Sequence, residues 1–286
     1  MKIPSSELPL QSNGAIYHIG IQLENLSDKI ILVGDPGRVE TISSKFDRVE
    51  FTHSHRELTT HTGWYKEKRI SVVSTGMGTD NIDIVLTELD ALANIDLQKM
   101  EHKSEHKTLT MVRIGTCGAI QKDIPVGACI AAQMGFGLDG LLQFYKHNSS
   151  EYEELVSHFV EFTGWGKRLP YPYCYPANQT LLETIAFDMV HGITASAPGF
   201  FGPQGRFVRA ALAFPHLNEK IENFVYQNQR ITNLEMECSA IYGLGNLLGH
   251  KTLTVCLAIA NRVTHQFLKD YSKEMDELVT KVLHRI

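Results

Sequence analysis

Three arginines stand where a fixed positive charge could bind an anion. Arg113 interrupts an apolar, strand-like stretch that runs into a glycine turn and Thr116. An unpaired guanidinium is costly to bury, so Arg113 implies either a partner carboxylate or a bound anion. Gly34 and Arg38 mark a second turn after another apolar stretch, whereas Arg56 would join them only through folding or a neighbouring subunit. These residues suggest a phosphate or oxyanion pocket at the carboxyl ends of strands, with a structural ion pair as the alternative.

Two carboxylates flank a methionine in the run Glu235, Met236 and Glu237, just before a predicted helix. A carboxylate can accept hydrogen bonds from two adjacent sugar hydroxyls, and a methionine can pack on the apolar face of a furanose. The run therefore indicates a site for a sugar diol. The alternative is structural, because the helix dipole favours glutamates at a helix start. The two glutamates are too near each other to favour the facing pair of a glycosidase.

A loop rich in glycine and proline carries Phe200, Gln204 and Arg206. The glutamine amide offers one acceptor and two donors, which match the N–H and C=O edge of a uracil ring. Arg206 could bind a second carbonyl, and Phe200 or Phe201 could stack on a base. From these residues alone, an ordinary polar loop is the simpler explanation.

No pattern in the sequence favours a metal site. His53 and His55 could form half of one, but spacing marks no third ligand, so a polar strand or loop is the simpler interpretation. The five cysteines are scattered and include no CxxC pair, which argues against a zinc knuckle. We therefore expect reduced thiols in a cytoplasmic protein without a metal centre.

Composition and charge argue against several classes of partner. The net charge of −5 disfavours general nucleic-acid binding. No apolar run is long enough to cross a membrane, and the first residues lack the apolar core of a signal peptide. The apolar fraction of 43% supports a sizeable core.

Apolar patterning predicts one α/β domain over residues 1–286, with a central mixed or parallel sheet flanked by helices. Besides a strand that begins at 111 and runs into the glycine turn, the predicted strands cover 29–33, 69–75, 127–132, 207–214 and 252–260. Besides a helix that ends near 248, the predicted helices cover 38–46, 81–95, 180–190 and 270–284. The charged composition of residues 98–107 predicts a solvated loop, and residues 139–178 show no clear pattern of helix or strand.

These separate motifs together resemble the nucleoside phosphorylases of the trimeric or hexameric type, and among them most closely the uridine phosphorylases. The shared motifs span nearly the whole chain in the family's order, at 17–20, 34–40, 54–57, 74–78, 113–120, 200, 204–206, 235–237 and 261–262. Each motif is weak alone, whereas the ordered set is specific. Cys117 departs from the pattern, because close uridine phosphorylases usually have threonine there.

The resemblance implies a role for each group of residues. The phosphate-binding residues it implies are Gly34, Arg38, Arg113, Thr116 and, from the adjacent subunit, Arg56. The ribose-binding residues it implies are Glu235, Met236, Glu237 and, in the neighbouring subunit's site, His18. The base-binding residues it implies are Cys117, Gly118, Phe200, Gln204, Arg206, Ile259 and Ala260. The residues expected to act in catalysis are Arg206, Gln204, Glu237 and Arg113.

The activity that the resemblance implies is reversible phosphorolysis of uridine to uracil and ribose-1-phosphate in pyrimidine salvage. Phosphate is a co-substrate and no cofactor is expected, although some relatives hold a potassium ion at a dimer interface near the position of Glu57. Shared sites imply a homo-oligomer, at least a dimer and in expectation a hexamer built as a trimer of dimers.

Three alternative functions remain open at this point. A purine nucleoside phosphorylase is disfavoured, because related purine enzymes place a proton-donating aspartate where this chain has Asn261. A nucleoside hydrolase of the same fold would not need three arginines. A non-catalytic nucleoside-binding protein is the third alternative. The choice between uridine, thymidine and deoxyuridine also stays open.

Overall fold

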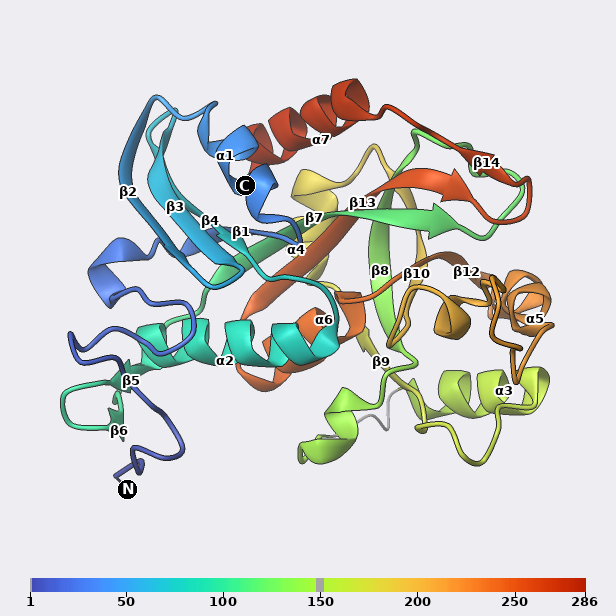
Figure 1. Ribbon diagram of the computed structural model, residues 1–286, viewed down its shortest axis with the longest axis horizontal. Coiled ribbons are helices and arrows are strands. Elements are labelled where there is room, and N and C mark those ends of the chain that lie inside the picture. Colours follow the sequence, from blue (N-terminus) through green and yellow to red (C-terminus); the bar gives the residue numbers. More distant parts are fainter. Residues whose placement is uncertain (1, 148–151) are drawn as a thin grey trace.

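A mixed β-sheet of twelve strands organises the part of the chain that the computed structural model describes, residues 2–147 and 152–286 (Figure 1). Its strands are β1 (Lys29–Val33), β2 (Arg48–His55), β3 (Leu58–Tyr65), β4 (Lys68–Ser74), β7 (Thr110–Ala119), β8 (Cys129–Gly137), β9 (Tyr173–Pro176), β10 (Val190–Ser196), β11 (Val225–Tyr226), β12 (Gln229–Glu235), β13 (Lys251–Asn261) and β14 (Gln266–Phe267). Two further short strands, β5 (Ile95–Asp96) and β6 (Glu101–His102), pair with each other.

Helices cover this sheet on its outer faces. They are α1 (Pro36–Ser43), α2 (Thr79–Asn94), α3 (Glu153–Thr163), α4 (Gln179–Ile185), α5 (Leu217–Asn223), α6 (Cys238–Leu247) and α7 (Ser272–Arg285). In Figure 1, α1 and α7 lie above the sheet, α2 and α6 lie below it, and α3 and α5 lie at the right. The α/β fold around a mixed sheet that we predicted is therefore confirmed. No helix in the described ranges has the length and apolar character needed to cross a bilayer.

Five strands close into a ring, which decides where the site lies. The order β12-β10-β8-β13-β7 is completed by an antiparallel pairing of β12 with β7, which joins Leu234 to Gly118 and Asn233 to Ala119. Strand β7 also pairs in parallel with β13 and with β1. The end of β12 is thereby fixed beside the end of β7, although the two strands are far apart in sequence.

The buried strands follow from their apolar runs. Residues Ile30–Val33 of β1 are fully buried, as expected for a parallel strand with helices on both faces. Helix α2 begins after Gly76 and Gly78, whose φ values of 71° and 97° lie in the left-handed region that favours glycine. The predicted strand 29–33 and the helices at 81–95 and 270–284 are confirmed to within a few residues.

Two predicted elements are wrong. Residues 207–214 form no strand, because the neighbouring strands β10 and β12 are already paired on both sides within the ring. Phe207 and Val208 are consequently 66% and 72% exposed. The helix predicted over 180–190 ends at Ile185, and Val190 instead starts β10.

Several elements carried no clear sequence signal. The β2–β3 hairpin, β10, β12 and the helix α3 were not predicted, because their residues are partly polar or stand in short runs. The segment 139–178, which showed no pattern, contains α3 and β9, and its residues 148–151 lie outside the described ranges.

Candidate active site

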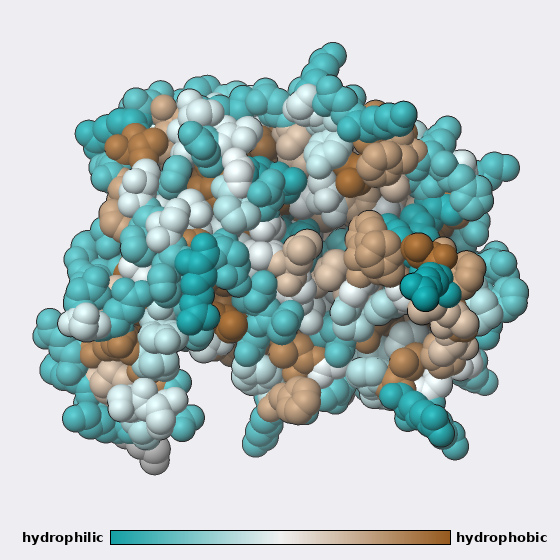
Figure 2. All heavy atoms as spheres, in the orientation of Figure 1, coloured by the Kyte–Doolittle hydropathy of each residue, from teal (hydrophilic) through white to brown (hydrophobic). Residues whose placement is uncertain are grey.

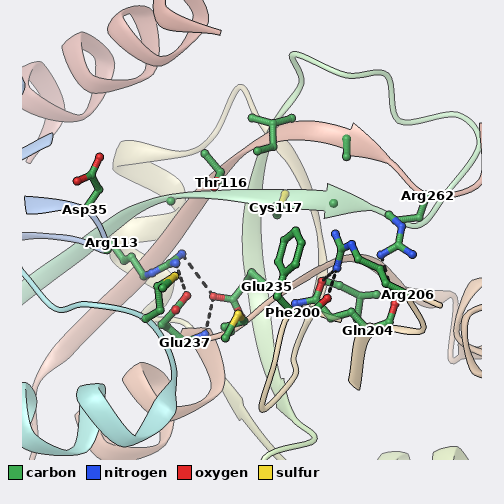
Figure 3. Close-up of a pocket in the computed structure, with 18 of the residues that line it drawn as sticks. Asp35, Arg113, Thr116, Cys117, Phe200, Gln204, Arg206, Glu235, Glu237 and Arg262 are labelled. Atoms are coloured by element: carbon green, nitrogen blue, oxygen red, sulfur yellow. Dashed lines mark hydrogen bonds and ion pairs between the residues drawn. The ribbon is translucent and has the colours of Figure 1, made fainter. Parts of the chain in front are cut away.

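A cavity of about 980 Å³ opens where β1, β7, β12 and β13 end. The residues predicted from the sequence that line it are Gly34, Arg38, Glu57, Arg113, Thr116, Cys117, Gly118, Phe200, Gln204, Arg206, Glu235, Met236, Glu237, Ile259 and Ala260. Figure 3 shows an elongated arrangement, with Arg113 toward one end, Arg206 and Arg262 at the other, and Glu235 and Glu237 between them. We call these the Arg113 end and the Arg206 end.

Arg113 is paired with both predicted carboxylates. Its Nη2 donates to Oε2 of Glu237, and its Nη1 lies 3.4 Å from Oε2 of Glu235. Nη1 also donates to Sγ of Cys256 at 3.3 Å. Burial lowers the pKa of Arg113, but the neighbouring negative charges, with Glu237 foremost, outweigh burial and leave the pKa above its ordinary value. The partner carboxylate implied by the sequence is therefore present, and Arg113 also lines the cavity.

The position of Arg113 depends on a glycine in its own strand. A Cβ atom at Gly115 would lie 2.1 Å from Nη1 of Arg113, far inside van der Waals contact. Strand β7 thus leaves room at Gly115 for the guanidinium to lie against the strand.

Both carboxylate oxygens of Glu235 accept hydrogen bonds from other groups of the protein. Its Oε2 accepts hydrogen bonds from the backbone N–H groups of Glu237 and Cys238, both at 2.9 Å, and its Oε1 accepts one from the Ser196 hydroxyl. Burial raises the pKa of the Glu235 carboxyl to about 7, which Arg113 opposes and Glu237 reinforces. Glu235 therefore organises the start of α6 rather than offering a free carboxylate to the cavity.

Glu237 is held from two sides at the cavity wall. Arg113 binds its Oε2, and the backbone N–H of Gly78 donates to its Oε1 at 2.8 Å. Met236 is half-buried and lines the cavity next to it. A carboxylate with fixed oxygens beside an apolar thioether is an arrangement that suits a sugar diol.

Arg38 supplies a second cation at the Arg113 end. It is the third residue of α1, and its Nη1 donates to the Ile114 carbonyl at 3.3 Å. Burial, followed by the charge of Arg113, lowers the pKa of Arg38. Gly34 and Thr116 also line the cavity. Two guanidinium groups that repel each other are stabilised by an anion placed between them.

The Arg206 end is built around a buried amide. Gln204 is 2% exposed, and its Oε1 accepts a hydrogen bond from Nη1 of Arg206 at 2.6 Å. The Arg206 guanidinium stacks over Phe200, with Cζ 3.7 Å from the ring centroid (Figure 3). Burial and the charge of Arg262 lower the pKa of Arg206 to about 10. A planar group with carbonyl and N–H edges fits this combination of amide, guanidinium and ring.

An apolar wall connects the two ends. It is formed where β7 and β13 run side by side, and their register places Ala260 opposite Gly118. Cys117 and Ile259 complete this wall. Burial, together with a hydrogen bond to the Cys256 thiol, raises the pKa of Cys117, so its thiol stays protonated and acts as a small apolar group.

Comparison with known proteins shows the family of this chain. The model of the phosphorylase superfamily matches residues 28–286. The chain is 33% identical to a uridine phosphorylase from Thermococcus kodakarensis, over 96% of this chain and 87% of that protein. It is 28% identical to a DeoD-type purine nucleoside phosphorylase from Geobacillus stearothermophilus, over 83% of each chain. A solved Trypanosoma brucei nucleoside phosphorylase that shows uridine phosphorylase activity matches with a TM-score of 0.87 and 29% identity, over 98% of this chain and 100% of that one.

The chain belongs to the nucleoside phosphorylase family. The ordered motifs that suggested this family therefore identified it correctly, and the loop that carries Gln204 and Arg206 lies in the same cavity as Arg113, Glu235 and Glu237.

Two residues that the family resemblance assigns to substrate lie outside this phosphorylase's own cavity. His18 and Arg56 line a separate depression of about 80 Å³. Glu57 and Asn81 line both spaces and so separate them. Within one chain, the structure does not bring His18 or Arg56 to the cavity.

Some lining residues were missed by sequence reasoning. They are Asp35, Met77, Asn81, Leu234, Arg262, His265, Gln266 and Phe267. Arg262 follows Asn261 in a family motif, which was a usable signal. The last three residues belong to the turn and short strand β14 that folds back on β13, and no periodicity marks a strand of two residues. Figure 2 shows apolar surface in the right-hand half of this face, the side where β14 and the loops before α5 lie in Figure 1.

Asn261, at the end of β13, is fully occupied by structural hydrogen bonds. Its Nδ2 donates to the carbonyls of Gln121 and Ile124 at 2.9 and 2.8 Å. Its Oδ1 accepts from the backbone N–H groups of Val263 and Thr264 at 2.9 and 2.8 Å. Its amide therefore holds the turn after β13.

Among the described residues, one group could hold a metal ion, and it lies outside the cavity. It consists of Asp90, His106 and His250. His250 already uses both ring nitrogens, since Nδ1 accepts from the Leu109 N–H at 3.2 Å and Nε2 lies 3.1 Å from Asp90. His53 and His55 are not part of that group.

Proposed function

We propose that this nucleoside phosphorylase acts on uridine and phosphate, releasing uracil and ribose-1-phosphate reversibly. The observation that carries the proposal is the Gln204–Arg206–Phe200 arrangement at one end of a cavity whose other end holds Arg38 and Arg113. A pyrimidine at the first end and phosphate at the second would place the glycosidic bond between them. Uridine phosphorylase activity is also what the relatives from T. kodakarensis and T. brucei are named for.

Phosphate binds at the Arg113 end in this proposal. Arg38 and Arg113 hold its charge, and Gly34 and Thr116 add a backbone amide and a hydroxyl. As the glycosidic bond lengthens, the sugar becomes oxocarbenium-like. The bound phosphate stabilises this cation and attacks C1′ from the face opposite the base.

Ribose binds between the ends. Glu237, whose oxygens are oriented by Arg113 and Gly78, accepts hydrogen bonds from the sugar hydroxyls, and Met236 packs on the furanose. Because the Glu237 carboxylate is already oriented, its side chain loses little conformational entropy when the sugar binds. Glu235 contributes indirectly by holding the turn in place.

The base leaves at the Arg206 end. Negative charge grows on the pyrimidine as the bond breaks, and donors from Gln204 and Arg206 stabilise it more strongly in the transition state than in the ground state. Asn261 cannot donate the carboxylic proton expected in the purine enzymes, and its amide is engaged in the turn. This favours a pyrimidine over a purine.

Sites shared between subunits complete the proposal. His18 and Arg56 lie together in a depression outside their own cavity, where a neighbouring subunit could present its cavity to them. We therefore propose a homo-oligomer, at least a dimer and in full a trimer of dimers. A potassium ion near Glu57 at such an interface also remains a prediction.

Uracil release from uridine tests this function, measured with and without phosphate and with thymidine and inosine in parallel. We expect release that depends on phosphate. Release without phosphate would instead indicate a hydrolase, and cleavage of inosine alone would contradict the assignment of Gln204 and Arg206. No cleavage of any nucleoside would favour a binding protein.

A further inference from the structure

The buried carboxylate of Glu88 makes all its hydrogen bonds within one short segment. Glu88 lies on α2 and is 5% exposed. Its Oε1 accepts from the His18 backbone N–H at 2.9 Å and lies 2.7 Å from Nδ1 of the His18 ring. Its Oε2 accepts from the N–H groups of His18 at 3.0 Å and Ile19 at 2.8 Å. Burying a carboxylate is costly unless its oxygens accept hydrogen bonds. The hydrogen bonds of Glu88 therefore serve to hold the segment that contains His18 and Ile19.

The other side of the His18 peptide is also held. Nδ1 of His55, at the end of β2, donates to the His18 carbonyl at 2.9 Å. The chain then turns at Gly20, which has a φ of 74° and donates its N–H to the Ile16 carbonyl at 3.0 Å. Helix α2 and strand β2 therefore fix His18, although it lies in a segment without regular structure.

The contact with Glu88 also decides which ring nitrogen carries the proton. A carboxylate oxygen accepts hydrogen bonds, so Nδ1 of His18 is the protonated nitrogen, and Nε2 of the neutral ring keeps a lone pair. A carboxylate behind an imidazole fixes the tautomer and the orientation of the ring. The His18 side chain is 30% exposed and shares its depression with Arg56. The ring thus offers a hydrogen-bond acceptor to a group from outside the chain.

We propose that Glu88 is a positioning residue that sets His18 as an acceptor for the 5′-hydroxyl of the nucleoside bound in the neighbouring subunit. The inference rests on the function proposed above. It predicts that selectivity for a free 5′-hydroxyl depends on a carboxylate that never touches the substrate. A nucleoside without that hydroxyl cannot make the contact with His18, so its kcat/KM does not depend on Glu88.

The test compares kcat/KM for uridine and 5′-deoxyuridine in five proteins. These are the wild type, Glu88→Gln, His18→Ala, the double variant Glu88→Gln/His18→Ala and the control Asp83→Asn. Asp83 lies on the same helix but bonds to Tyr145 and lines neither depression nor cavity. We expect Glu88→Gln to lower kcat/KM for uridine roughly 10- to 100-fold, as loss of an orienting partner commonly does. Its value for 5′-deoxyuridine should stay within about 2-fold, because only the hydroxyl contact is lost.

Further results separate positioning from a general structural role. His18→Ala should show the same substrate-dependent loss, the double variant should be no worse than His18→Ala, and Asp83→Asn should match the wild type. Equal losses with both nucleosides, or a large drop in the melting temperature, would make Glu88 merely structural and overturn the inference. A wild type that uses both nucleosides equally well would also overturn it. Absence of phosphate-dependent uracil release by the wild type would refute the proposed function itself.

Discussion

At the scale of single residues, the site combines charges that a folded protein normally keeps apart. Arg206 is half-buried, and burial, followed by the charge of a second arginine, Arg262, lowers its pKa to about 10. Arg113 and Arg38 repeat this arrangement at the opposite end, although Arg113 has carboxylate partners. Such unfavourable pairs persist when an anionic ligand or transition state relieves them.

Replacing Arg206 by alanine tests the Arg206 end. Arg206→Ala removes a donor to the departing base, and we expect uridine turnover to fall roughly 100-fold or more. The matched control is Arg209→Ala, an exposed arginine in the same loop that does not line the cavity. Steady-state kinetics of uracil release measure both. Near-normal turnover by Arg206→Ala would remove this residue from the mechanism.

The raised pKa of Glu235 predicts a pH dependence of stability. Burial raises it from 4.5 to about 7 in the folded protein, so the folded state binds a proton that the unfolded state releases between these values. The resulting stabilisation is complete below about pH 4.5 and is lost as the pH rises through about 7. Relative to Glu235→Gln, which cannot titrate, the wild type should lose free energy of unfolding between pH 5 and pH 8. Denaturant unfolding at several pH values measures this difference, and a pH-independent difference would contradict it.

At the scale of elements, strand β7 contributes to every part of the cavity. It carries Arg113 at one end, Thr116 and Cys117 along the wall, and Gly118 where β12 crosses over to pair with it. Its glycines therefore serve different purposes. Gly115 makes room for the Arg113 guanidinium, whereas a Cβ atom at Gly118 would lie 3.3 Å from Cγ of Arg262, so Gly118 leaves room for that side chain at the Arg206 end.

A methyl group in β7 should displace Arg113. In Gly115→Ala the new Cβ would lie 2.1 Å from Nη1, so the guanidinium must move away from Glu237 and Glu235. We expect destabilisation of roughly 1–3 kcal/mol, as for overpacking elsewhere, together with loss of phosphorolysis. Thermal unfolding and uracil release measure the two effects. A fully active and equally stable variant would show that Arg113 does not need its observed position.

At the scale of the whole molecule, closure of the five-stranded ring and the proposed subunit contact together complete the site. The ring joins the Arg113 and Arg206 ends within one chain. His18 and Arg56 stay outside it, in their own depression. A protein with this geometry has incomplete sites as a monomer if those two residues act on substrate.

Complementation between two inactive variants tests site sharing. Arg206→Ala damages a chain's own cavity, and Arg56→Ala damages only what that chain contributes to its neighbour. Co-expression with two different affinity tags yields mixed oligomers in which some pairs contain one intact site. Random pairing restores about a quarter of the sites, since about half the pairs are mixed and each has one intact site of two. Uracil release that stays at the level of the separate variants would show that each cavity uses its own chain's Arg56.

The sequence by itself determined the local features of this protein. Apolar runs marked β1, β7 and β13, apolar residues at helical spacing marked α2 and α7, and the order of short motifs identified the family. These features depend on neighbouring residues or on motif order, so they can be read from the chain alone. The strand predicted at 207–214 does not form. Its composition is typical of a strand, but the neighbouring strands β10 and β12 have no free edge to pair with it.

Only the tertiary structure decided which distant residues meet. The ion pair of Arg113 and Glu237 joins positions 124 apart in the sequence, and it exists because β12 turns back to pair with β7. The contact of His18 with Glu88 spans 70 positions, and it depends on α2 packing beneath the first segment of the chain. Long-range pairing is set by closure of the sheet and packing of the helices, which local sequence patterns do not encode.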